Sequence, residues 1–149
     1  MNRRERIIET AAVVLTLSLL GGVGIAVPAY QHYRVRKSAA GAQVVELYAS
    51  AERGIWTQEP LRGYNASIRH VEKKPIRVKA GQPILFRLTS IDVHHSFSIP
   101  ELRVFPHDVT PGHWTEVRVD PLDRGTYTVT CYTVCGMKHS SMDAELQVF

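Results

Sequence analysis

The sequence predicts a mostly β protein, in which a small β-sandwich is joined to one N-terminal membrane-spanning helix. Three observations predict this fold class. An uncharged apolar run fills residues 11–29, short segments rich in β-branched and aromatic residues recur from residue 67 onward, and turn sequences separate those segments. The chain has 149 residues, enough for one small domain and an anchor. We therefore expect an anchor over 1–37, a connection over 38–65 and a β domain over 66–149.

The net charge of +4 lies entirely beside the apolar run. Residues 1–37 carry six basic and two acidic side chains, whereas residues 38–149 carry twelve of each. A nucleic-acid-binding domain needs a basic patch on its folded surface, so we expect no nucleic-acid partner. The neutral domain also argues against strong electrostatic steering of a charged partner.

The apolar run over 11–29 reads AAVVLTLSLLGGVGIAVPA. As a helix it would be about 28 Å long, close to the hydrocarbon thickness of a bilayer. Tyr30 and Tyr33 follow at the position where aromatic residues mark the membrane interface. A cleaved signal peptide is the alternative, with Val27 and Ala29 preceding the cleavage site. The run is long for a signal peptide, which favours an uncleaved anchor that contacts membrane lipid.

After the anchor, residues 38–53 predict a helical or mobile linker. Seven short strands are predicted beyond it, at Ser67–Glu72, Ile76–Lys79, Ile84–Thr89, His95–Ile99, Trp114–Val119, Thr126–Cys131 and Ala144–Phe149. The turn pairs Ala80-Gly81 and Pro111-Gly112 separate some of them. Short strands without intervening helical patterns favour an antiparallel β-sandwich and argue against a parallel α/β sheet.

One stretch between two predicted strands, TCYTVCGMKHSSM, carries four candidate metal ligands: Cys131, Cys135, His139 and Met142. A loop can bring several donors around one point while the flanking strands hold its ends. Gly136 gives this loop the backbone freedom for a sharp turn.

A further ligand is expected from the segment IDVHHSF, which offers His94 and His95. In a strand, Val93, His95 and Phe97 share one face, and these apolar neighbours mark the inward side. We therefore expect His95 to be the ligand and His94 to be exposed. A bulge at the strand end would reverse this assignment.

Several chemistries fit parts of this donor set. Cys131 and Cys135 could form a disulfide, or bind zinc together with His95 and His139. Met142 favours copper, because a thioether is a soft, weak donor, although most methionines simply pack in a core. A one-copper blue site uses a single cysteine. Two thiolates, two imidazoles and one thioether suit two coppers bridged by both sulfurs.

The two motifs together resemble the CuA domain of cytochrome c oxidase subunit II, where Asp-Val-x-His-Ser-aromatic precedes Cys-x3-Cys-Gly-x2-His-x2-Met. The similarity covers roughly Val78 to Phe149 and includes VKAGQPILFRLTS and DRGTYTVTC. It implies a cupredoxin-like Greek-key β-sandwich. It also implies a dinuclear copper centre in which Cys131 and Cys135 bridge the ions. One copper then takes His95 and Met142, and the other takes His139 and the backbone carbonyl of Thr133.

The resemblance further implies a role in respiratory electron transport. Such a subunit accepts electrons from a cytochrome c-like donor and passes them to haem in subunit I, where dioxygen is reduced. The expected partners are therefore subunit I, the donor and membrane lipid, with no catalytic residue in this chain. The expected location is the plasma membrane, with a single span and the soluble domain on the periplasmic or extracellular side.

Three departures from the family pattern have consequences. Thr133 stands where an acidic residue is common, so we expect no magnesium ligand from this chain. The usual tryptophan-rich run is absent, which leaves Trp56 and Tyr132 as candidate exposed docking aromatics. The single apolar span resembles the short subunit II of B-type oxidases.

Four other functions compete with this interpretation. A nitrous oxide reductase would add a β-propeller, for which this chain has neither the length nor the repeats. A nitric oxide reductase with a CuA subunit would look alike. A membrane-anchored copper chaperone or thiol protein is thioredoxin-like and needs neither His139 nor Met142. A structural subunit that has lost copper would not keep the complete donor set.

Overall fold

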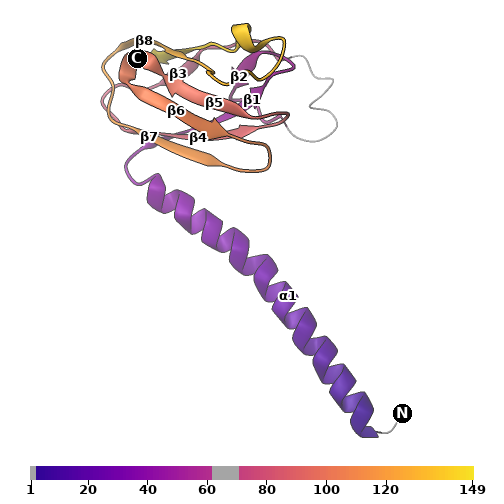
Figure 1. Ribbon diagram of the computed structural model, residues 1–149. Coiled ribbons are helices and arrows are strands. Elements are labelled where there is room, and N and C mark those ends of the chain that lie inside the picture. Colours follow the sequence, from indigo (N-terminus) through magenta and orange to yellow (C-terminus); the bar gives the residue numbers. More distant parts are fainter. Residues whose placement is uncertain (1–2, 62–70) are drawn as a thin grey trace. The chain divides into compact units, whose positions relative to one another are not determined.

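The structure, a computed structural model, describes residues 3–61 and 71–149. The chain divides into two compact units, Met1–Ala40 and Gly41–Phe149. The first unit is the helix α1, Arg3–Ser38, which is drawn in indigo to purple in Figure 1. It is long and apolar enough to cross a membrane, and its apolar side chains from Ile7 to Val27 are exposed. The sequence prediction of one N-terminal apolar helix is thus confirmed.

The second unit is built of strands and two single-turn 3₁₀ helices. The strands are β1 Gln43–Ser50, β2 Ile55–Thr57, β3 Ile76–Val78, β4 Ile84–Ser90, β5 His95–Ile99, β6 Val104–Val109, β7 Thr115–Val119, β8 Gly125–Val129 and β9 Ala144–Val148. The 3₁₀ turns are η1 Pro100–Leu102 and η2 His139–Ser141. In the described part of this unit no α-helix follows a strand, so the βαβ alternation expected of a thioredoxin-like fold is not found there.

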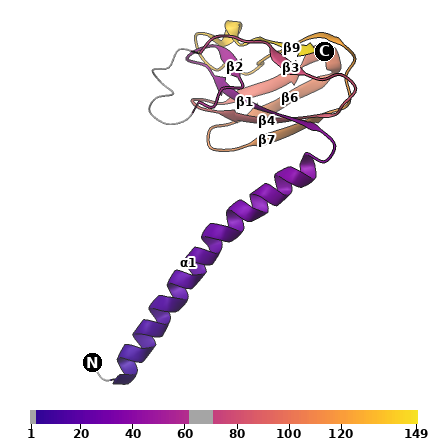
Figure 2. The same ribbon diagram turned by 180° about the vertical axis from the view of Figure 1, so that it is seen from behind.

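The strands form two layers, which Figures 1 and 2 show from opposite sides. One layer is the sheet β2-β1-β4-β7. The other contains β3-β9-β8 and the pair β5-β6, and a bridge between Ser98 and Thr130 joins β5 to the end of β8. This mostly β sandwich is cupredoxin-like, as the resemblance implied.

The core lies between the two layers. Phe86 of β4 and Phe97 of β5 face each other with ring centroids 5.1 Å apart, and Val129 and Leu146 of the second layer are fully buried with them. Burying large apolar side chains from both layers is the main source of stability in such a fold. The same core includes Cys131, Cys135 and Met142, so the candidate ligands belong to the packed end of the sandwich.

Five of the seven predicted strands match β3, β4, β5, β7 and β9 to within one residue at each end, and Thr126–Cys131 overlaps β8 with a shift at its C-terminal end. The predicted strand Ser67–Glu72 lies mostly outside the described residues, and its last two residues are not in a strand. The expectation of an antiparallel sandwich is wrong for two pairs, because β1 is parallel to β4 and β3 is parallel to β9.

The helical or mobile linker over 38–53 is also wrong, because β1 lies inside a sheet, between β2 and β4. Its sequence, QVVELYAS, contains the helix formers Glu46, Leu47 and Ala49. Seven residues of β1 pair with β4. This pairing stabilises the strand conformation and outweighs the local preference of the segment for a helix. The sequence prediction also missed β6, whose only described partner is β5. A proline such as Pro106 is tolerated in an edge strand, where its missing N–H breaks no ladder.

Candidate metal centre

The candidate ligands lie in the loop that joins the antiparallel strands β8 and β9. Strand β5 runs beside the start of this loop, because Ser98 and Thr130 exchange two backbone hydrogen bonds of 3.0 and 3.1 Å. His95 at the start of β5 is thereby brought to the loop. The yellow 3₁₀ turn η2 within the loop lies at the β2 end of the domain in both views (Figures 1 and 2).

The two cysteines form the centre of the site. Their Sγ atoms are 3.9 Å apart and both thiols are free. A disulfide requires about 2.05 Å, so no bond joins these sulfurs in the structure. Both side chains are buried, and the ligating atoms of Cys131, Cys135 and His95 all lie within 4.8 Å of one another. This cluster is the type of arrangement that holds a metal ion.

Each sulfur has two further donors beside it. On the Cys131 side, Sγ lies 3.3 Å from the carbonyl oxygen of Thr133 and 4.0 Å from Nδ1 of His95. The loop therefore folds back so that a backbone carbonyl two residues after the cysteine faces its own sulfur.

On the Cys135 side, Sγ lies 3.6 Å from Nδ1 of His139 and 3.3 Å from Sδ of Met142. Met142 is fully buried and His139 half-buried. Gly136, with φ of 136°, makes the turn that returns the chain toward Cys135. The structure thus brings together all six donors named from the sequence.

Asp92 holds the ring of His95. Its Oδ1 lies 2.9 Å from Nε2 of His95, while Oδ2 accepts from Ser50 Oγ and the backbone N–H of Glu52, each at 3.1 Å. Burial opposes ionisation of Asp92, but hydrogen bonds from His95 and the N–H groups of Val93 and Glu52 outweigh it and hold the pKa of this carboxyl far below its usual range. An ionised Asp92 accepts a hydrogen bond from Nε2–H of His95, which leaves the Nδ1 lone pair directed toward the sulfurs.

As the sequence predicted, His95 is buried and His94 is exposed, although one of the two neighbours used for that prediction does not face inward. His95 is fully buried, whereas His94 is exposed and pairs with Asp108 at 2.9 Å. Val93, however, which was expected to share the inward face, is 43% exposed. All five residues of β5 are buried, and Ser96 and Ser98, on the other face of the strand from His95, hydrogen-bond the backbone of residues 130–133.

Ser96 supports the first half of the loop. Its buried Oγ accepts hydrogen bonds from the backbone N–H groups of Tyr132 and Thr133, at 2.8 and 3.0 Å. Neither Ser96 nor the role of Asp92 was predicted from the sequence. Both lie in the segment IDVHHSF, so the signal that located His95 contained them too.

The thiol of Cys135 is a poor acid in this surrounding. Burial, followed by the neighbouring Cys131, raises the pKa of Cys135 to about 11. Two adjacent buried thiolates are unfavourable without a cation, and a soft metal ion between them supplies the compensating charge. Two sulfurs, two imidazole nitrogens, a thioether and a carbonyl fit copper better than the harder divalent ions.

Three apolar side chains of the loop lie at its outer surface. Val134 is 85% exposed, and Tyr132 and Met137 are also exposed. The expectation for Trp56 is wrong, because this side chain is 1% exposed and packs in the core against Phe97. Of the two aromatic residues named as exposed candidates, only Tyr132 is at the surface.

Comparison with known proteins gives a consistent result. The family model COX2, described as cytochrome C oxidase subunit II, periplasmic domain, matches residues 55–148, more than half of the chain. The alternative cytochrome c oxidase subunit 2 of Bradyrhizobium diazoefficiens is 32% identical over 108 residues, which are 68% of this chain and 38% of that protein. Cytochrome c oxidase subunit 2 of Thermus thermophilus is 34% identical over 71 residues, 48% of this chain and 52% of the relative. The matches thus span about half or less of these relatives.

Two solved structures share the fold. The periplasmic domain of subunit II of cytochrome oxidase from Bradyrhizobium japonicum superposes with a TM-score of 0.53 at 20% identity, over 73% of this chain and 85% of that one. A chain from a cryo-EM structure of a heme-copper terminal oxidase dimer superposes with a TM-score of 0.54 at 19% identity. That match covers 99% of this chain and 100% of the other.

Proposed function

Since this chain belongs to the cytochrome c oxidase subunit II family, we propose that it is the subunit through which electrons enter a haem–copper terminal oxidase. It accepts electrons from a cytochrome c-like donor at a dinuclear copper centre, CuA, and passes them to haem in subunit I. Dioxygen is reduced in subunit I, so this chain contributes to the oxidoreductase without catalytic residues of its own.

The observation that carries this proposal is how the donors are divided between the two sulfurs. One copper would be held by His95 and Met142, the other by His139 and the Thr133 carbonyl, with both cysteine sulfurs shared. In each pair, one donor lies beside Cys131 Sγ (His95 or the Thr133 carbonyl) and the other lies beside Cys135 Sγ (Met142 or His139). If two ions share both sulfurs, each ion needs donors from both sides of the sulfur pair, as found here. A site for a single ion would leave some of these donors unused.

When bound, a sulfur-bridged copper pair takes up and releases one electron with little change in geometry. The contribution of the chain is to hold the donors still. Asp92 fixes the ring of His95, Ser96 binds the loop backbone, and β8 and β9 hold the loop ends. Ligands locked by a second layer of hydrogen bonds resist rearrangement when the charge of a site changes.

The exposed apolar side chains of the loop support a docking role for its outer surface. Tyr132 and Val134 lie between the two cysteines in sequence, and Met137 lies between Cys135 and His139. Exposed apolar groups clustered in one loop are typical of interaction sites. A redox partner seated on this loop would approach the ligands closely.

The helix α1 would anchor the protein as a single span in lipid, with the β domain on the periplasmic side. Its exposed apolar surface suits hydrocarbon, and Tyr30 and Tyr33 suit the membrane interface. The family model describes a periplasmic domain, which supports this orientation. Thr133 has no carboxylate, so we expect no magnesium ligand from this chain.

The test is rapid mixing of a reduced cytochrome c-like donor with the intact membrane complex purified through this chain. We expect haem in the co-purified large subunit to be reduced, and Cys135→Ser to abolish that reduction while the complex still assembles. Equal haem reduction in the variant would overturn the proposal. Consumption of nitric oxide in place of dioxygen would reassign the complex to the CuA-bearing nitric oxide reductases.

A further inference from the structure

The hairpin formed by β1 and β2 touches the second half of the metal loop. The indole Nε1–H of Trp56 donates to the carbonyl oxygen of Met142 at 3.1 Å, and both groups are buried. Gly54, at φ of 64°, lies so close to the loop that an added Cβ would collide with Ser141 Oγ. The hairpin therefore contacts the loop at the ligand methionine and at the residue before it.

The backbone of Met142 is held on both sides. Its N–H donates to the carbonyl of His139 at 3.0 Å, which closes η2, and its carbonyl accepts from Trp56. Met142 lies just before β9, where no sheet pairing holds it directly. These two hydrogen bonds thus set the point from which the thioether reaches toward Cys135.

The indole ring also contacts another ligand residue. Its centroid is 6.1 Å from the His95 ring and 5.7 Å from Phe97, in edge-to-face arrangements. Such packing restricts the ring to one orientation. The direction of the Nε1–H bond is therefore determined by the core, and the Met142 carbonyl is held where that bond points.

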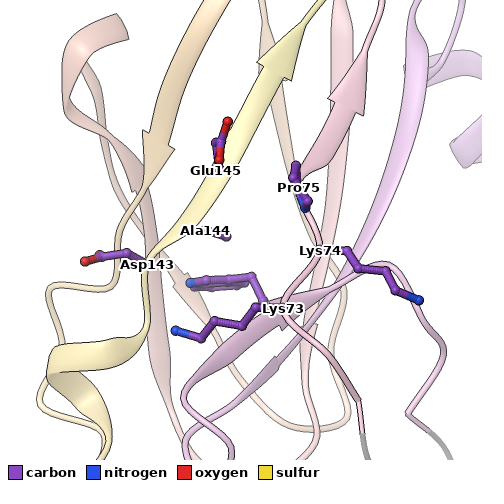
Figure 3. Close-up of a pocket in the computed structure, with 7 residues that line it drawn as sticks. Lys73, Lys74, Pro75, Asp143, Ala144 and Glu145 are labelled. Carbon is purple, nitrogen blue, oxygen red and sulfur yellow. The ribbon is translucent and has the colours of Figure 1, made fainter.

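Trp56 also lines a surface pocket of about 230 Å³. Figure 3 shows its charged neighbours, Lys73 and Lys74 from the segment before β3 and Asp143 and Glu145 around the start of β9. Lys73 Nζ also donates to the carbonyl of Ser141. The carbonyls of Ser141 and Met142 are thus both bound by donors from outside the loop, next to a pocket large enough to admit water.

We propose that Trp56 is a positioning residue for Met142, which sets how closely the thioether approaches copper. This inference rests on the proposed function. A thioether is a weak ligand, so its distance from the metal depends on where the backbone places it, more than for imidazole or thiolate. Losing the Trp56 hydrogen bond frees the Met142 carbonyl to turn toward water in the pocket, and the thioether moves with it.

The competing explanation is that Trp56 only fills the core. Both explanations predict that replacing the indole lowers stability, but they differ in the reduction potential. If Trp56 acts through Met142, the potential shift caused by its replacement requires a thioether at position 142. A double-mutant cycle between the two positions isolates that dependence.

The experiment compares copper-loaded full-length protein in detergent as wild type, Trp56→Phe, Met142→Leu and the double variant. Trp114→Phe is the matched control, because Trp114 is partly exposed and stacks on Arg87. We expect Trp56→Phe to keep two coppers and to shift the potential in the same direction as Met142→Leu, by less. The double variant should match Met142→Leu, and the control should match wild type. A shift of equal size in both backgrounds, or none beyond the control, would overturn the proposal.

If Trp56→Phe does not fold, Gly54→Ala takes its place, because it pushes the hairpin from Ser141 and should also shift the potential only when Met142 is present. A second measurement needs no copper: the rate at which the indole N–H protons of the metal-free protein exchange with solvent. The Trp56 proton should exchange at least about a hundredfold more slowly than that of Trp114. Equal exchange rates would refute the hydrogen bond, whereas failure of the wild type to bind two coppers would refute only the proposed function.

Discussion

The two halves of the metal loop are supported by different parts of the chain. The first half binds Ser96 of β5, one residue from the ligand His95. The second half binds Trp56 of β2, 86 residues away from Met142 in sequence. In the first half, the ligand His95 and the supporting residue Ser96 belong to the same short sequence motif. In the second half, the support lies outside any ligand motif, and only the fold brings it to the site.

The largest effect is expected from Cys135→Ser, at the junction of the two halves. Because Cys135 Sγ lies beside both His139 and Met142, its loss removes one bridge and separates the second half of the loop from the first. We expect the two-copper site to be lost, as measured by copper content and electron paramagnetic resonance. Val134→Ser, at the exposed neighbouring position, should keep both ions. Two coupled coppers in the Cys135 variant would refute the bridging role.

The support of the first half is tested by Ser96→Ala. This change leaves the N–H groups of Tyr132 and Thr133 without their acceptor, which should lower the free energy of unfolding by about 1–3 kcal/mol. Thermal or denaturant unfolding of the metal-free protein measures the loss. Ser140→Ala, at an exposed position in η2, serves as the control and should change stability little. Equal stability of the two variants would show that Ser96 does not hold the loop.

Met142→Leu tests the second half of the loop, and we expect a smaller effect from it. The two side chains have similar volume, so the buried position should tolerate the change at a cost below about 1.5 kcal/mol. We expect both coppers to remain and the reduction potential to shift, because a weak donor has been removed. Met137→Leu, in the same loop but fully exposed, should leave the potential unchanged. Loss of copper from the Met142 variant, or an unshifted potential, would contradict this division of roles.

The smallest effect concerns salt. The domain has equal numbers of acidic and basic residues over 38–149, and the metal loop exposes the apolar side chains of Tyr132, Val134 and Met137. Donor docking should therefore be mostly apolar, with a rate constant that changes by less than about threefold over about a tenfold change in ionic strength. Stopped-flow oxidation of the donor measures this. A steep decline with salt would show that local charges dominate the interface.

The same comparison explains what the sequence could predict. The ligand loop was predictable because spacing, residue type and flanking strands are all local. The inward position of His95 was predicted correctly, although of the two neighbours used to predict it Phe97 is buried and Val93 is exposed. The β1–β2 hairpin was not predictable. Its strand conformation depends on parallel pairing of Gln43 through Ala49 with Ile84 through Ser90, which a local reading cannot detect. Trp56 was consequently placed at the surface, although the fold buries it beside the ligands.

The strand β6 was also not predictable from its local sequence. Its Pro106, His107 and Asp108 are typical of a loop, yet an edge position beside β5 accepts them. Asp92 and Ser96 were visible in the motif, but their functions emerge only when the structure shows which atoms they contact. The sequence thus located the donors, whereas the groups that orient them required the three-dimensional arrangement.

Whether two coppers share the sulfurs of Cys131 and Cys135 can be decided with the full-length protein in detergent after copper loading. Copper content and the electron paramagnetic resonance spectrum are measured on the same sample. We expect two coppers per chain that share one unpaired electron. One copper, bound zinc, or a disulfide without metal would contradict it, and the proposed role in electron transfer would then have to be withdrawn.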